Sequence, residues 1–188
     1  FPESVKIVCC QNCEPCTSTF CDNYINVCEH VPLFRGNRVH NIAKARNIVL
    51  QHVMQDIQNV AIVDLDLKLI EPIQLNYWQP NTVMTFGQKS DYYDTWAFRD
   101  AHMGHNFKTF AEAKQISNYV RNQILTPTEV YSAFGGIALV NPVPSHDCRY
   151  LENDDDCEHV KYNACLRNHG MKIIVDTSIH LVADQRHS

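Results

Sequence analysis

The sequence predicts a single α/β domain with a central, largely parallel, mixed sheet flanked by helices. Short apolar runs rich in β-branched residues alternate along the chain with segments whose apolar residues recur at helical spacing. The 188 residues are enough for one domain with a hydrophobic core, and no internal repeat or low-complexity segment divides them.

Composition narrows the class of protein. Hydrophobic residues make up 45% of the chain and charged residues 20%, which is typical of a folded domain rather than a disordered chain. The net charge of −5 and the lack of a basic tract argue against a nucleic-acid partner. No apolar run is long enough for a membrane span, so we expect a soluble, cytoplasmic protein; a Golgi-lumenal protein that has lost its anchor is the alternative.

The first third of the chain predicts a strand, a short strand and a helix. The strand covers residues 5–10, the short strand lies within 24–31, and the helix runs from 38 to 54. Arg46 falls in the apolar stripe of that helix. Either its stem packs while its head reaches solvent, or its head binds a phosphate or a carboxylate in a cleft, and the sequence leaves both open.

Two acids follow the apolar run at 60–63. A continuous run of this kind is typical of a strand buried on both faces in the middle of an α/β sheet. Asp64 and Asp66 then fall at the carboxyl end of the strand, where α/β sheets bind ligands. They could share a divalent cation that carries phosphates, or the first could be a phosphoryl nucleophile.

The middle of the chain predicts a strand at 82–86 and a helix at 106–124. Between them, residues 91–100 mix aromatic and charged side chains without a clear period. Such a segment more often lines a site than fills a core, because each ring brings a polar neighbour; a surface loop is the alternative.

The last third predicts a strand at 130–140, a helix at 158–168 and a strand at 172–176. Gly135–Gly136 interrupts the first strand, which indicates a bulge or a ligand close to the backbone. Gly170 is well placed to end the helix.

The state of the cysteines stays open. The chain has nine, and six lie in the first 28 residues, where Cys13 and Cys16 could form half a zinc site or a redox pair. No second close pair completes a zinc site, so at least one disulfide and reduced thiols packed as small hydrophobic groups stay open beside it. The odd count and the adjacent cysteines favour reduced thiols.

Three features favour a metal at Asp64 and Asp66 over a haloacid-dehalogenase-like phosphatase. The phosphatase motif normally lies on the first strand, whereas a strand and a helix precede Asp64 here. The motif has a small hydroxyl or β-branched residue where this chain has Lys68. Its later acids follow a buried strand, whereas residues 154–156 follow a polar loop flanked by prolines. A cysteine-stapled, non-catalytic sugar- or zinc-binding module is the third hypothesis.

Five ordered patches then resemble a known family. They cover residues 38–47, 63–66, 93–100, 134–136 and 157–160. They are similar to GT-A glycosyltransferases, in particular to the fungal capsule-associated mannosyltransferases. The cysteine-rich start is not part of that family's pattern.

The resemblance implies a GT-A-like, Rossmann-like domain that acts as a metal-dependent hexosyltransferase. The donor would be a UDP- or GDP-sugar and the acceptor a glycan or glycoprotein hydroxyl, with UDP preferred on class frequency alone. Asp66 would bind Mn²⁺ or Mg²⁺, Asp64 would bind the ribose or the metal through water, and His180 would be a third ligand. Residues 1–70 would bind the nucleotide and 71–188 the acceptor.

Further roles follow from the same resemblance. They are diphosphate binding by Arg38 and Arg46, sugar contacts by Asp94 and Arg99, and backbone contact with the acceptor at Gly135 and Gly136. If the enzyme inverts configuration, Glu158 is the expected catalytic base and Asp156 the second candidate. If it retains configuration, no such base is needed, and the sequence does not decide between the two.

Overall fold

The computed structural model describes residues 6–9, 24–27, 38–51, 60–64, 67–69, 79–86, 94–103, 110–140, 147–152, 156–178 and 181–183. The helices in these ranges are α1 (Arg38–Gln51), α2 (Phe110–Gln123) and α3 (Glu158–Asn168). The strands are β1 (Lys6–Cys9), β2 (Tyr24–Val27), β3 (Val60–Val63), β4 (Leu67–Leu69), β5 (Thr82–Phe86), β6 (Thr128–Val130), β7 (Ile137–Val140), β8 (Lys172–Asp176) and β9 (Leu181–Ala183).

A mixed five-stranded sheet lies at the centre, with strand order β3-β7-β5-β8-β6. The α/β class is confirmed, but the prediction that the sheet is largely parallel is wrong. β5 and β8 are parallel, whereas the other three pairings in this sheet are antiparallel. An apolar run reports burial on both faces, which β5 has at all five residues, but it does not report the direction of the neighbouring strands.

The strand before Asp64 is not the buried central strand that the sequence predicts. β3 lies at the edge of the five-stranded sheet, and among the described strands it pairs with β7 alone. Val60 and Ile62 pack against the core, while Ala61 and Val63 are exposed. β-branched residues also suit an edge strand, so the apolar run alone could not distinguish the two positions.

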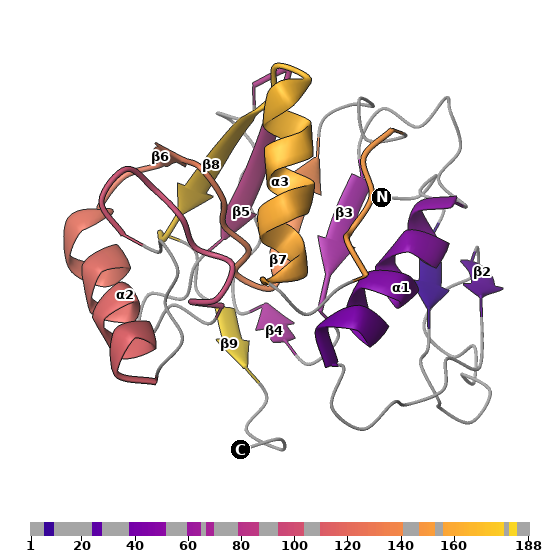
Figure 1. Cartoon of the computed structure of the whole chain (residues 1–188), viewed down its shortest axis with the longest axis horizontal. Coiled ribbons are helices and arrows are strands. Elements are labelled where there is room, and N and C mark those ends of the chain that lie inside the picture. Colours follow the sequence, from indigo (N-terminus) through magenta and orange to yellow (C-terminus); the bar gives the residue numbers. More distant parts are fainter. Residues whose placement is uncertain are drawn as a thin grey trace.

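The three helices share one core with the sheet. Figure 1 shows α3 lying in front of the sheet, with α1 beside β3 and α2 on the side of β6. Leu50 of α1, Val120 of α2 and Leu166 of α3 belong to the same buried cluster as Val83 and Ile173 of the sheet. Because side chains alternate along a strand, Met84, Phe86 and Ile137 form a second buried cluster on the other face.

The predicted strand at 130–140 is two strands. β6 ends at Val130 and pairs with β8, while β7 begins at Ile137 and pairs with β3 and β5. Between them Ser132 forms a bridge to Arg99: the Arg99 N–H donates to the Ser132 carbonyl at 2.8 Å, and the Ser132 N–H donates back at 3.0 Å. The glycines therefore lie in the connection rather than in a bulge.

The predicted helix at 158–168 and the strands at 82–86 and 172–176 are confirmed with the same ends. The helices at 38–54 and 106–124 are confirmed over 38–51 and 110–123. β1 and β2 fall inside their predicted ranges. None of the helices in the described ranges combines the length and the apolar character needed to span a bilayer.

The end of α3 shows why its prediction succeeded. Gly170 has φ +83°, a backbone conformation that residues other than glycine adopt only with strain. Its N–H donates to the Arg167 carbonyl at 2.9 Å, and the Met171 N–H donates to the Leu166 carbonyl at 3.1 Å. This is a Schellman motif, which ends the helix at a position marked in the sequence by the glycine.

Candidate functional site

Arg46 of α1 joins two acids that are far apart in the sequence. Its Nη2 donates to Asp64 Oδ1 at 2.9 Å, directly after β3, and its Nη1 donates to Glu158 Oε1 at the first residue of α3. The Arg46 side chain is 15% exposed. Of the two interpretations that the sequence left open, the binding of a carboxylate by the guanidinium is confirmed.

Two aromatic rings hold the guanidinium in place. Arg46 Cζ lies 4.9 Å from the ring centre of Phe134 and 5.5 Å from that of Tyr150. A cation over an aromatic face is stabilised by about 0.5–2 kcal/mol, more where water is excluded. Burial acts to lower the pKa of Arg46, but Tyr150, Glu158 and Asp64 outweigh it and raise that pKa, so the guanidinium stays charged.

Asp94 adds a third carboxyl group to the site. Burial, together with the charges of Glu158 and Asp64, raises its pKa to about 7 against the opposing effects of Arg46 and the Ala97 N–H. Its Oδ1 accepts a hydrogen bond from the Ala97 N–H at 3.3 Å. Three acids therefore interact with one guanidinium, and at neutral pH the site has an excess of negative charge.

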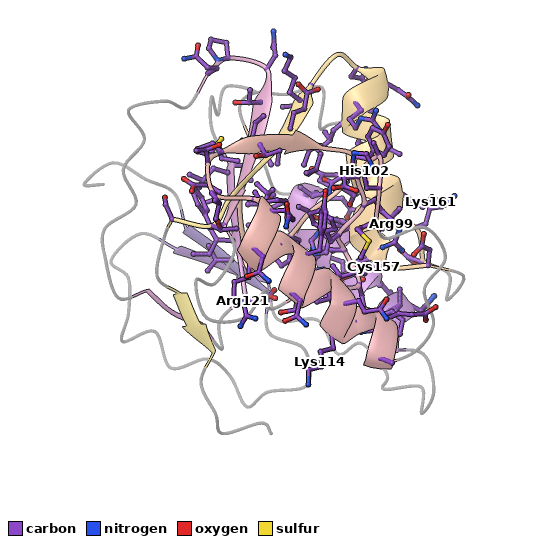
Figure 2. The ribbon with its side chains drawn as sticks, turned by 90° about the vertical axis from the view of Figure 1, so that its left-hand side faces the viewer. Arg99, His102, Lys114, Arg121, Cys157 and Lys161 are labelled. Carbon is purple, nitrogen blue, oxygen red and sulfur yellow. A yellow bond between two sulfur atoms is a disulfide. The ribbon has the colours of Figure 1, made fainter. Side chains whose placement is uncertain are left out.

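Arg99 and Asp156 connect the turn at residues 94–99 to the start of α3. Arg99 Nη2 donates to Asp156 Oδ1 at 2.6 Å, and Arg99 Nη1 donates to the carbonyls of Trp96 at 2.9 Å and Phe98 at 2.7 Å. The Cys157 N–H also donates to Asp156 Oδ1, which places Arg99 beside Cys157 at the start of α3 (Figure 2). Both groups thus position the 94–99 turn. The sugar contact of Arg99 and the base role of Asp156 stay predictions.

Gly136 fixes the backbone of Asp64. The Asp64 N–H donates to the Gly136 carbonyl at 2.8 Å, one residue beyond the β3–β7 ladder. Gly136 has φ +90°, which favours glycine at this position. Both Gly135 and Gly136 are buried, and the backbone that approaches Gly136 here is that of Asp64. Contact with an acceptor stays a prediction.

Three of the predicted ligands fall outside what the structure describes. Asp66 and His180 lie outside the described residues, and Arg38 begins α1 but its side chain is not described. Of the predicted metal ligands, the structure therefore places Asp64 alone, at the expected end of β3 and bound to Arg46.

The chemistry of the site suits a hard divalent cation. Asp64, Asp94 and Glu158 offer oxygen donors and excess negative charge, which Mn²⁺ and Mg²⁺ favour. These three do not complete a metal site by themselves. Among the described residues, the group whose possible ligand atoms all lie within 4.8 Å of one another is Cys148, Cys165 and His169. A divalent ion at Asp64 would thus need ligands such as Asp66 and His180.

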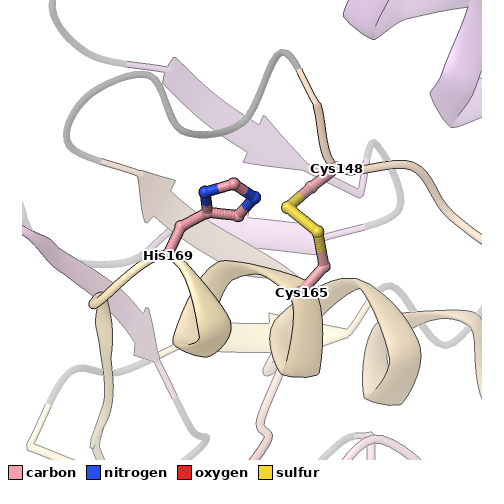
Figure 3. A group of neighbouring side chains, drawn as sticks. All are labelled: Cys148, Cys165 and His169. Atoms are coloured by element: carbon pink, nitrogen blue, oxygen red, sulfur yellow. A yellow bond between two sulfur atoms is a disulfide. The ribbon is translucent and has the colours of Figure 1, made fainter.

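The sulfur atoms of that group are already bonded to each other. Cys148 and Cys165 form a disulfide, with His169 beside it (Figure 3). For these two cysteines the preference for reduced thiols was wrong. Disulfides persist in oxidising compartments, so the cytoplasmic location stays a prediction beside the lumenal alternative. Cys157 is a free thiol whose pKa burial raises well above its usual value, which makes it a weak nucleophile.

The disulfide anchors a segment that packs against α1. Asn47 Nδ2 donates to the Tyr150 carbonyl at 2.8 Å, and the Tyr150 N–H donates to Asn47 Oδ1 at 2.8 Å. Cys148 ties the same segment, residues 147–152, to α3. Asn47 is adjacent to Arg46, and the Tyr150 ring lies against the guanidinium, so this segment sets the position of Arg46.

His159 is a further buried residue of the site. It stacks on Phe134 with ring centres 3.8 Å apart, and burial, then Arg46, lower its pKa well below its usual value, so the imidazole is neutral. Four residues belong to the site although the sequence did not predict them there: Asn47, Phe134, Tyr150 and His159. Asn47, Phe134 and His159 lie inside the patches at 38–47, 134–136 and 157–160, which was a usable signal, whereas nothing in the sequence marked Tyr150.

No protein-family model matches the sequence, and no curated protein matches it either.

Proposed function

We propose that the protein is a metal-dependent glycosyltransferase that moves a sugar from a UDP- or GDP-sugar to a hydroxyl of a glycan or glycoprotein. The observation that carries the proposal is Arg46, held between Asp64 at the end of β3 and Glu158 at the start of α3. A largely buried guanidinium fork surrounded by excess carboxylates suits a diphosphate that is bound together with a divalent cation. The five ordered sequence patches support the same function.

Each side chain has a defined task in this proposal. Asp64 and Asp66, with His180, would hold Mn²⁺ or Mg²⁺, and the ion would neutralise the charge that develops on the leaving diphosphate. Arg46 would bind the diphosphate, and Arg38 is expected to assist. Because Phe134 and Tyr150 lie against the guanidinium, Arg46 is already oriented before a nucleotide binds.

The acceptor hydroxyl must lose a proton. If configuration is inverted, Glu158 is the proposed base, since its carboxylate is buried in the site next to Arg46. Asp156 is the second candidate, and its carboxylate, like that of Glu158, is bound to an arginine. Asp94 would contact the sugar, where a carboxyl with a pKa of about 7 can either donate or accept a hydrogen bond.

A thermal-shift screen tests the proposal. UDP, GDP and their sugars should raise the melting temperature in the presence of Mn²⁺ and have little effect with a chelator, because ligands that bind the folded state stabilise it. Asp64→Asn should lose this response. Glu129→Gln is a matched control, because Glu129 is an exposed acid on β6 that pairs with Lys172 outside the site.

The other outcomes separate the alternatives. No response to any nucleoside diphosphate would overturn the proposal. Trapping by beryllium fluoride would instead indicate a phosphatase with an aspartate nucleophile. Stoichiometric zinc that is lost to a chelator, together with no turnover, would indicate a non-catalytic module.

A further inference from the structure

Trp96 is a large apolar side chain that the fold leaves exposed. It is 44% exposed, whereas its neighbours Thr95, Ala97 and Phe98 are 8%, 0% and 0% exposed. An indole gains much from burial, because it removes a large apolar area from water. The turn thus buries the residues on both sides of Trp96 and presents the indole at the surface.

The turn that carries Trp96 is held by hydrogen bonds at both ends. The Ala97 N–H donates to the Asp94 carbonyl at 3.2 Å and to Asp94 Oδ1 at 3.3 Å. Arg99 Nη1 donates to the carbonyl of Trp96 itself at 2.9 Å. Because the backbone of the turn is already fixed, binding of a ligand to the indole does not cost the conformational entropy of ordering a loop.

Trp96 lies at the rim of the site around Arg46. Asp94, two residues earlier in the same turn, interacts electrostatically with Glu158, Arg46 and Asp64. Arg99, which holds the Trp96 carbonyl, also binds Asp156, two residues before Glu158. Figure 2 shows Arg99 beside Cys157, where this brace meets the start of α3. Trp96 and Asp94 are therefore carried by one turn, which Arg99 connects to the start of α3.

We propose that Trp96 is the stacking surface for a pyranose ring, and that Asp94 bonds the hydroxyl groups of the same sugar. A pyranose has an apolar face of C–H groups with slightly positive hydrogens, which matches the negative face of an indole ring. Its edge carries hydroxyl groups, which need a polar partner such as a carboxyl group. The pairing of Trp96 and Asp94 on one fixed turn supplies both. That this sugar is a substrate rests on the proposed function.

The first test uses the fluorescence of Trp96. The chain has two tryptophans, Trp78 and Trp96, so Trp78→Phe leaves Trp96 as the one indole. Methyl α-D-mannopyranoside, methyl α-D-glucopyranoside and methyl β-D-galactopyranoside are the probes. At least one of them should change the emission of Trp78→Phe in a saturable way. The double variant Trp78→Phe/Trp96→Phe, excited at its tyrosines, should show no saturable change.

The second test measures affinity. For the glycoside that responds, saturation-transfer NMR should show binding weakened by roughly tenfold in Trp96→Ala and by less in Trp96→Phe, which keeps an aromatic face. Tyr131→Ala is the matched control, because Tyr131 is 41% exposed and its ring lies against Arg167 instead. Thermal melting of each variant checks that it is folded.

The outcomes distinguish this inference from the proposed function. If a nucleoside diphosphate binds with Mn²⁺ but no glycoside changes the emission of Trp96, or if Trp96→Ala binds as well as the parent, the stacking role is wrong and the glycosyltransferase proposal stands. If a glycoside binds at Trp96 but no nucleotide binds, the stacking role stands and the glycosyltransferase proposal fails.

Discussion

Replacing Arg46 by methionine should destabilise the protein strongly, because it leaves acids without their cation. Methionine keeps most of the length of the stem, so the change removes the guanidinium rather than the packing. The side chain of Glu158 is 8% exposed and that of Asp64 is 28% exposed, so Glu158 would bear most of the uncompensated charge. Breaking a buried ion pair in this way costs about 3–5 kcal/mol.

Urea unfolding followed by circular dichroism measures this loss. At pH 7 we expect the free energy of unfolding to fall by about 3–5 kcal/mol in Arg46→Met. Arg46→Lys keeps a charge but lacks the planar fork, so it should lie between the parent and Arg46→Met.

A double-mutant cycle with Glu158→Gln isolates the contact itself. If Arg46 and Glu158 form the buried pair described here, their combined effect should differ from the sum of the single effects by more than about 1 kcal/mol. Additive effects, or a loss below about 0.5 kcal/mol in Arg46→Met at pH 7, would refute the reasoning.

Three further predictions concern the groups around this pair. Asp94 has a pKa of about 7 in the folded chain and an ordinary value of 3.8, so in metal-free buffer its contribution to stability is full below about pH 4 and is lost as the pH rises towards 7. This decrease in the free energy of unfolding is at most on the order of 4 kcal/mol, and it should be absent in Asp94→Asn. If the free energy of unfolding of Asp94→Asn and of the parent changed in parallel between pH 4 and 8, the prediction would be wrong. Cys148→Ser/Cys165→Ser removes a disulfide that closes a loop of 17 residues, so the free energy of unfolding should fall by about 3 kcal/mol. Reduction of the parent protein by a dithiol should have the same effect. If neither the substitutions nor the dithiol changed the free energy of unfolding, the disulfide would not form in the protein. Asn47→Ala leaves the N–H and the carbonyl of Tyr150 without their partner, so it should lower the free energy of unfolding by on the order of 2 kcal/mol. Asn118→Ala is the control, because Asn118 is exposed on α2 and its loss should be nearly neutral. Equal effects of the two substitutions would argue against the role of Asn47 in holding residues 147–152.

Local signals in the sequence predicted the helices and most strands well. The helix at 158–168 has an acid at its start and Gly170 after its end, and both features act within a few residues. The direction of the strands was not predictable in the same way. It depends on which distant strand each one meets, and an apolar run carries no information on that choice.

The site was predictable in part for the same reason. The apolar stripe of α1 placed Arg46 on the inward face of the helix but left the direction of its head open, because its partner Glu158 is 112 residues away. The edge position of β3 depends on its pairing with β7, which the residues of β3 do not encode. Likewise, the disulfide forms because α3 and the segment 147–152 pack together, so the count of cysteines alone could not assign it.

Turnover of nucleotide sugars tests the central claim most directly. The parent protein should release UDP or GDP from at least one nucleotide sugar in the presence of Mn²⁺, and a chelator should stop the release. Asp66→Ala should abolish it while the far-ultraviolet circular dichroism spectrum stays that of the parent. No metal-dependent release from any UDP- or GDP-sugar, or unchanged release by Asp66→Ala, would contradict the account.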